Sequence, residues 1–145
     1  MKVLKKYFNK VDKKVIKVLK KISFPSLRYS LAIIFVWFGL LKTLGSSPAQ
    51  ELVANTVYWF SSAWFVPFLG WWEVLIGVCL LYKPLIRLGL FLLIIQMIGT
   101  FLPLILLPEV VYGYKFYILT LEGQYIIKNL ILISSGIAIG SNLKE

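Results

Sequence analysis

The sequence contains no histidine and a single cysteine, Cys79. Haem with two histidine ligands, histidine-ligated zinc or copper, and cysteine-ligated iron–sulfur clusters therefore have no ligands in this chain. A Cys-x-x-Cys redox pair is excluded as well. We expect no metal site and no built-in cofactor, so that any redox role would need a diffusible cofactor or a partner chain.

Charged residues are also scarce, at 15%, whereas 59% of the residues are hydrophobic and the mean hydropathy is +0.83. Soluble domains average about 45–50% apolar and about 25% charged residues. The composition therefore indicates an integral membrane protein. At about 20 residues per span, a chain of 145 residues holds four short helices and hardly any soluble domain.

Four apolar runs approach the length of a membrane span. They lie at about residues 27–44, 64–82, 84–107 and 124–140. The second and third are separated only by a tight turn at Lys83, which makes them an antiparallel hairpin. The predicted fold class is all-α: an integral membrane four-helix antiparallel bundle over residues 27–145, preceded by a basic amphipathic helix over residues 1–26.

A shorter helix is predicted after the first span. Ser47 supplies a side-chain acceptor, Pro48 stands at the first helical position and Gln50 follows three residues after the cap. This combination is a helix-start signature. We expect a helix at the membrane interface from here to about Ser61, and a longer polar and aromatic loop over residues 108–123.

The basic charge is concentrated at the N-terminus. Residues 1–28 hold nine lysines and Arg28 against a single acidic residue, Asp12, out of a net charge of +10. Lysines there face away from a helical stripe of apolar residues. The stripe comprises Val3, Leu4, Tyr7, Phe8, Val11, Val15, Val18, Leu19 and Ile22.

This amphipathic pattern predicts that residues 1–22 bind anionic lipid headgroups at the membrane surface. Docking on a soluble partner is the alternative. Nucleic acid is not an expected partner, because the basic face is attached directly to a membrane span. At the start of that span, Arg28 is expected to extend toward the interface.

Lysine and arginine placement also predicts the orientation of the spans. The N-terminal segment, Lys83, Arg87 and Lys144 fall on one side, whereas the connections on the other side hold only Lys115. The positive-inside rule then places both termini in the cytoplasm. The tryptophans at positions 59, 64, 71 and 72 would form an aromatic belt at the outer interface.

Apart from Arg28 and Arg87 near the starts of the first and third spans, three charged residues lie within the predicted spans: Lys42, Glu73 and Lys128. A charge at the centre of a span costs about 2.5–3.5 kcal/mol, so such residues face the bundle interior and find partners. Glu73 lies about 13 Å and Lys128 about 6 Å below the outer end of its helix, a difference that a lysine stem bridges. This depth comparison predicts a Glu73–Lys128 pair. Lys42 either joins this pair or extends to the interface instead.

Amides complete the candidate polar cluster. Gln96 shares a helix face with Gly99, Thr100 and Pro103, and Gln124 lies one turn before Lys128, while Gly70 and Gly77 flank Glu73. Such a cluster serves either as a ligand site or only as helix–helix packing, and the sequence leaves both open. The candidate site residues are Lys42, Glu73, Gln96, Gln124 and Lys128.

Several short motifs together carry a family resemblance. They are Arg28 and Ser30 at the start of the first span, Gly39-Leu-Leu-Lys42, Ser47-Pro48, Trp72-Glu73 with Gly77, and the run from Glu122 to Asn129. In this order, over about residues 27–142, the chain resembles the DoxX-like family of small four-span membrane proteins. The branch it resembles most contains the YkgB-type proteins of the bacterial inner membrane. Some relatives are parts of a thiosulfate:quinone oxidoreductase, and others are associated with oxidative or reactive-chlorine stress.

The resemblance implies a small inner-membrane protein that acts as an accessory subunit of a redox or stress-response system. A quinone or small-molecule pocket at the polar cluster is part of that expectation, with partner subunits in a membrane complex. The lack of histidine and of paired cysteines argues against an autonomous oxidoreductase. A structural or assembly subunit of a larger membrane complex and a small transporter are the alternatives.

Overall fold

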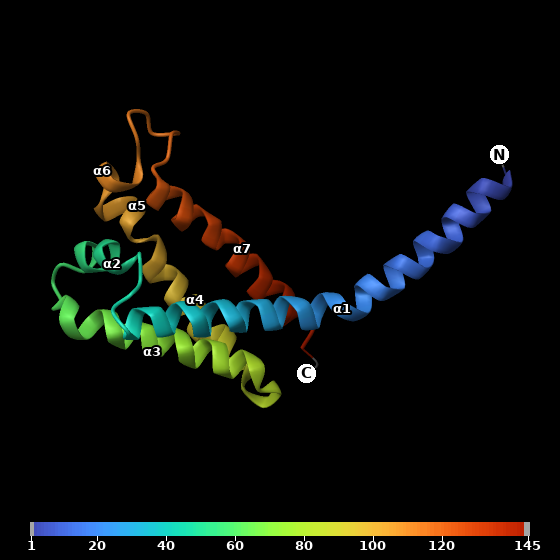
Figure 1. Cartoon of the computed structure of the whole chain (residues 1–145), viewed down its shortest axis with the longest axis horizontal. Coiled ribbons are helices and arrows are strands. Elements are labelled where there is room, and N and C mark those ends of the chain that lie inside the picture. Colours follow the sequence, from blue (N-terminus) through green and yellow to red (C-terminus); the bar gives the residue numbers. More distant parts are fainter. Residues whose placement is uncertain (1, 144–145) are drawn as a thin grey trace.

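The computed structural model describes residues 2–143, and every regular element in that range is a helix (Figure 1). Tyr112 and Leu119 form one isolated β-bridge. The helices are α1 (Lys2–Thr43), α2 (Gln50–Thr56), α3 (Ser62–Leu81), the 3-10 turn η1 (Lys83–Leu85), α4 (Ile86–Phe101), α5 (Pro103–Leu106), α6 (Pro108–Val111) and α7 (Leu121–Ser141). The predicted all-α class is confirmed.

Three helical segments of the described chain are long and apolar enough to cross a membrane. They are Val11–Thr43, Ser62–Leu81 and Lys83–Leu106, and each covers one of the first three predicted spans except for its last residue. The chain therefore has the character of a membrane protein. The fourth predicted span lies in α7, where Lys128 and Asn129 interrupt the apolar residues, and it is not among these three.

The predicted amphipathic segment and the first span form one continuous helix. No break separates residues 26 and 27, and Pro25 lies inside α1. Proline removes one helical hydrogen bond and disfavours a straight helix. Figure 1 shows that α1 changes direction along its length and that its N-terminal part extends away from the other helices. We call residues 2–24 of α1, before Pro25, the arm.

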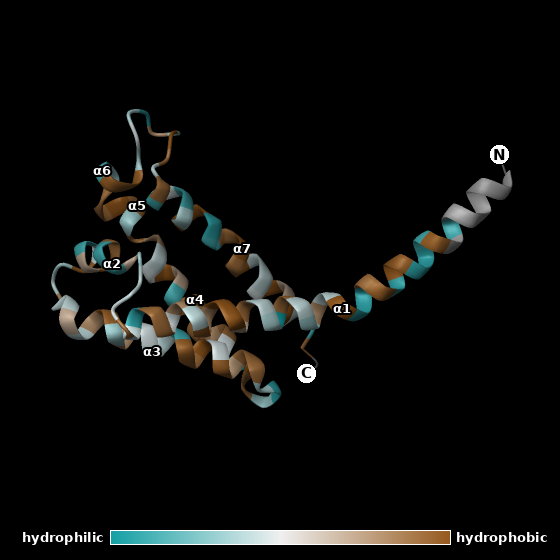
Figure 2. Ribbon diagram, in the orientation of Figure 1, coloured by the Kyte–Doolittle hydropathy of each residue, from teal (hydrophilic) through white to brown (hydrophobic). Residues whose placement is uncertain are grey.

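From residue 11 onward the arm alternates hydrophilic and hydrophobic residues, whereas α3 and α4 are mainly hydrophobic (Figure 2). From Val11 onward its apolar side chains are exposed, for example Val15 and Ile22. The side chains expected to continue this stripe at Val3, Leu4, Tyr7 and Phe8, and Lys144 at the other terminus, lie outside the described part. The attachment of the arm to lipid stays a prediction.

Glycines set the packing of α1 against α3. A Cβ atom on Gly39 would lie 2.5 Å from the Gly70 carbonyl oxygen, and one on Gly77 would lie 2.7 Å from the Ala32 carbonyl oxygen. The two helices are therefore antiparallel and touch backbone to backbone. Close approach through small residues is a common way for helices to associate in lipid.

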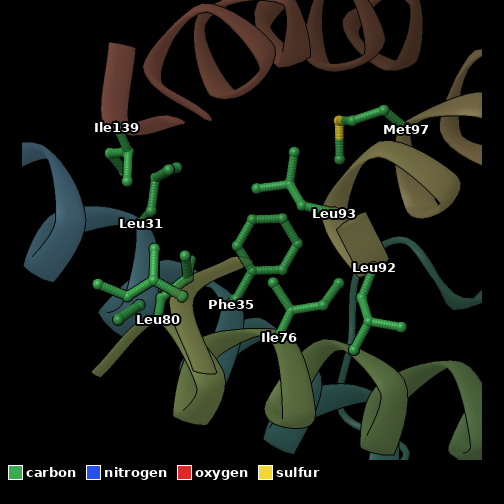
Figure 3. Close-up of a cluster of buried hydrophobic side chains, with 10 residues drawn as sticks. Leu31, Phe35, Ile76, Leu80, Leu92, Leu93, Met97 and Ile139 are labelled. Atoms are coloured by element: carbon green, nitrogen blue, oxygen red, sulfur yellow. The ribbon is translucent and has the colours of Figure 1, made fainter. Parts of the chain in front are cut away.

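The other two long helices complete one core. A Cβ on Gly89 of α4 would meet Cys79, and one on Gly140 of α7 would meet Leu90, which places the C-terminal end of α7 beside the start of α4. Cys79 is buried, as expected for a small apolar residue. Figure 3 shows the core side chains contributed by α1, α3, α4 and α7: Leu31, Phe35, Ile76, Leu80, Leu92, Leu93, Met97 and Ile139.

The short helix after the first span begins later than predicted. Ser47 is not its N-cap: the Ser47 Oγ accepts a hydrogen bond from the Ala49 N–H at 3.3 Å, within a turn, and α2 starts at Gln50. The side chain is used by this turn and does not cap the helix. The helix also ends at Thr56, before Ser61, and a turn follows over residues 57–59. After this turn Phe60 stacks on Phe65, with the ring centroids 5.2 Å apart.

The predicted loop over residues 108–123 is more ordered than expected. It contains α6 and the N-cap of α7, where the Thr120 Oγ1 donates to the Val110 carbonyl at 2.6 Å and accepts from the Gly123 N–H at 3.2 Å. A Cβ on Gly123 would collide with the Val111 carbonyl oxygen. These contacts fix the start of α7 against α6.

Candidate functional site

One carboxylate joins α1, α3 and α4. The Lys42 Nζ donates a hydrogen bond to the Glu73 Oε2 at 2.6 Å, and the Gln96 Nε2 donates to the Glu73 Oε1 at 2.8 Å. The Lys42 and Glu73 side chains are each only 9% exposed. Charge-assisted hydrogen bonds of this kind are among the strongest in proteins. We call Lys42, Glu73 and Gln96 the polar triad.

Helical spacing and one glycine bring the triad together. Lys42 follows Leu31 and Phe35 on the buried face of α1. Its stem passes over Gly70, where a Cβ would lie 2.9 Å from the Lys42 Cβ, and Glu73 stands one turn further along α3. Any larger residue at position 70 would occupy the space that the lysine stem needs.

Gln96 is held in place from its own helix. The Thr100 Oγ1 donates to the Gln96 carbonyl at 3.0 Å, and the Gln96 side chain is buried between α4 and α3. Pro103, predicted on the same face, is buried too, whereas Gly99 is exposed. The triad therefore has one carboxylate at its centre, with the Lys42 ammonium on one oxygen and the Gln96 amide on the other.

The predicted Glu73–Lys128 pair is wrong. Lys128 is exposed on α7, and its Nζ lies 4.9 Å from the centroid of the Tyr125 ring. The buried face of α7 contains Ile126, and Lys128 lies about 200° around the helix from it, on the opposite side. A comparison of depths fixes the height of a side chain in the bundle but not the direction in which it points.

Gln124 is also outside the triad. Its side chain is exposed, and its Nε2 donates to the Leu119 carbonyl at 3.4 Å. Of the five candidate residues, the structure thus brings together Lys42, Glu73 and Gln96 and leaves Gln124 and Lys128 apart.

Trp72 is partly buried, although its sequence position predicted only an interfacial role. It packs against the core and against the Phe68 ring at 6.2 Å, and its buried Nε1 has no hydrogen-bond partner within the described residues. Trp59, Trp64 and Trp71, by contrast, are at least half exposed, as an aromatic belt requires. Only the packing of α3 distinguishes Trp72 from these other tryptophans.

Hydrogen-bond donors predominate around the carboxylate. An ammonium group has three donors, of which the Glu73 Oε2 accepts one, and an amide NH2 group has two. Within residues 2–143, no group of three acidic, cysteine or histidine side chains could hold a metal ion. The chemistry of the site therefore favours a ligand with acceptor oxygens.

Comparison with known proteins gives no relative for this chain: no protein family, no curated protein and no solved structure matches it. The resemblance to DoxX-like proteins accordingly stays a prediction.

Proposed function

We propose that this chain is a four-span inner-membrane protein of the DoxX-like type that binds a quinone headgroup at the polar triad and serves as an accessory subunit of a redox or stress-response system. The observation that carries the proposal is the buried Lys42–Glu73 ion pair. Ionisable residues inside membrane helices are expensive and commonly mark ligand or ion sites.

The course of α7 supports its role as the fourth span. Its 21 residues extend about 32 Å, which suffices for a hydrocarbon core of about 30 Å. It starts at α6 and ends beside the first turns of α4, so it passes along the bundle from one end to the other. Its polar residues 128 and 129 lie within two turns of its start, where they can reach the interface.

Charge placement supports the cytoplasmic location of both termini. Arg28, Lys83 and Arg87 lie at the end of the bundle where α1 enters and α7 finishes, and the acidic residues Glu51 and Glu109 lie at the other end. The positive-inside rule assigns the basic end to the cytoplasm.

The donors of the site match a quinone. A quinone ring is flat and apolar and carries two carbonyl oxygens that accept hydrogen bonds. Lys42 and Gln96 offer nitrogen donors within an apolar core, and Glu73 orients both. A few convergent polar groups in an apolar setting are typical of small-molecule sites. The role as an accessory subunit rests on the family resemblance and on the absence of histidine and paired cysteines.

The test is quinone retention by the intact protein. The purified chain, reconstituted in nanodiscs with ubiquinone and menaquinone, should keep about one quinone per chain after washing, as measured by extraction and chromatography. Lys42→Met should lower the bound quinone at least tenfold, because it removes a donor and leaves Glu73 without its cation. Lys128→Met makes the same chemical change at an exposed position of α7 and should retain the quinone.

Two results would contradict this function. One is a folded wild-type chain that retains no quinone above the level of an unrelated membrane protein. The other is equal loss in the Lys42 and Lys128 variants. If the triad variants instead keep quinone levels but lose a stoichiometric partner chain on purification, the triad serves assembly of a complex.

A further inference from the structure

α1 buries two cations on one face. Arg28 and Lys42 lie on the same side as Leu31 and Phe35, with exposed fractions of 5% and 7%. They are separated by about 21 Å along the helix. Arg28 was expected to extend to the interface, and the structure shows that it does not. The two residues differ in what neutralises them.

Arg28 has no counter-ion within the described residues. Its Nη2 donates to the Tyr29 hydroxyl at 2.9 Å, and its guanidinium lies 4.8 Å from the centroid of the Tyr29 ring. The Nε is buried and has no hydrogen-bond partner in residues 2–143. Lys42, in contrast, has the Glu73 carboxylate. A buried charge without an opposite charge is strongly unfavourable, so an anion is needed here.

The described part of the chain offers none at this end of the bundle. Glu51, Glu109 and Glu122 belong to the opposite end, around α2, α6 and the start of α7. Asp12 lies in the arm, about 24 Å before Arg28 along α1. The nearby Lys83 is exposed and adds positive charge. An anion at Arg28 would therefore be drawn from outside these residues.

A shallow groove between α1 and α7 includes Leu27, the residue before Arg28 in the sequence. Its lining residues are Leu27, Leu130, Ile131, Ser134, Ser135 and Ala138. The Ser134 hydroxyl is bonded within its own helix, to the Leu130 carbonyl at 2.9 Å. The groove is thus largely apolar, and an acyl chain fits it better than a soluble anion does.

We propose that Arg28 binds the phosphate of an anionic phospholipid whose acyl chain lies in the α1–α7 groove. The guanidinium is a planar fork that binds phosphate through two parallel hydrogen bonds, and the free Nε is one half of that fork. Tyr29 accepts one hydrogen bond from Nη2, which keeps a second N–H for the phosphate. Basic pockets between helices on the cytoplasmic side are known to bind anionic headgroups. This site is independent of the quinone proposal, because it lies about 21 Å from Lys42 along α1.

Native mass spectrometry of the full chain in detergent tests the proposal. Phosphatidylglycerol, phosphatidylcholine and inorganic phosphate are titrated separately. We expect one phosphatidylglycerol to bind at least tenfold more tightly than phosphatidylcholine, and inorganic phosphate not to compete at millimolar concentration. Arg28→Met should abolish this preference, Arg28→Lys should leave part of it, and Lys83→Met should change the affinity less than twofold.

Control measurements distinguish loss of the lipid site from loss of the fold. Circular dichroism and gel filtration establish that each variant is folded, and Arg28→Lys retains the charge if Arg28→Met does not fold. Equal binding of the two lipids by the wild type, or equal effects of the Arg28 and Lys83 variants, would overturn the site. Competition by inorganic phosphate would overturn the lipid as its occupant. If the chain's own Glu145 carboxylate were the counter-ion of Arg28, it would compete with the lipid. Tighter phosphatidylglycerol binding by Glu145→Gln than by the wild type would show this and overturn the proposal.

Discussion

Glu73 accepts hydrogen bonds on both of its carboxylate oxygens, one from an ammonium group and one from an amide. The two donors come from different helices, so a single side chain links both α1 and α4 to α3. An internally paired charge can specify packing as well as bind a ligand. The two roles differ in what happens when both charges are removed together.

A double-mutant cycle on Lys42 and Glu73 measures the pair. Lys42→Met or Glu73→Gln alone should destabilise the protein, by up to about 3–5 kcal/mol, because each leaves its partner buried without a counter-charge or full hydrogen bonding. The double variant should lose less than the sum, with a coupling of about 0.5–3 kcal/mol. Unfolding free energies in mixed detergent micelles provide the measurement.

Lys128→Met is the control for this cycle, since Lys128 is exposed and not joined to Glu73. Its effect should stay within about 0.5 kcal/mol. Strictly additive losses for Lys42 and Glu73 would mean that the pair does not contribute to stability. Recovery of stability in the double variant without recovery of quinone would separate the ligand role from packing.

At the level of elements, α1 and α3 are held by backbone contact at Gly39 and Gly70. Gly39→Ala should destabilise the protein by about 1–3 kcal/mol, because a methyl group at this site must push the helices apart. The same shift would draw Lys42 away from Glu73, so quinone binding should fall as well. Unfolding in mixed micelles and quinone retention are both suitable readouts.

Gly99→Ala is the matched control, because a Cβ at Gly99 has no neighbour within 4 Å. Alanine is favoured over glycine in a helix by about 0.5–1 kcal/mol, so this variant should be neutral or slightly stabilised. Equal destabilisation by both changes would show that helix propensity, and not the α1–α3 contact, controls the response.

Hydropathy predicted the positions of the long helices well, but it predicted poorly which side chains contact each other. The apolar runs gave the second span to within two residues, because membrane helices need a fixed length of apolar chain. Gly70 and Gly77, which flank Glu73 in the sequence, both face α1. The partner of Glu73 was missed because it depends on which helices are neighbours, and that is decided by the backbone contact of Gly39 with Gly70. The burial of Trp72 and of Arg28 was missed for a similar reason. The sequence holds several tryptophans and several cations, and only the packing of the helices decides which of them is buried.

For the whole molecule, four spans require that the two ends of the bundle lie on opposite sides of the membrane. Single cysteines in place of Ser46 and Ser141, in a Cys79→Ala background, should react with an impermeant maleimide from opposite sides of oriented vesicles. Position 46 follows α1 and position 141 ends α7, and both are exposed. Labelling of both from the same side would contradict α7 as a spanning helix.

The Lys42–Glu73 ion pair also constrains how the protein is made. Its two residues are 31 positions apart, so at roughly 5–20 residues per second Glu73 is synthesised about 2–6 s after Lys42. During that interval the first helix has a charge near its end that no later helix neutralises. When α3 is synthesised, it supplies both the Glu73 carboxylate and the glycines that let α3 approach α1 closely. The bilayer therefore accommodates α1 and α3 best as a pair. Insertion of this protein is therefore expected to proceed by helical hairpins, the second of which delivers Gln96 to a carboxylate already in place.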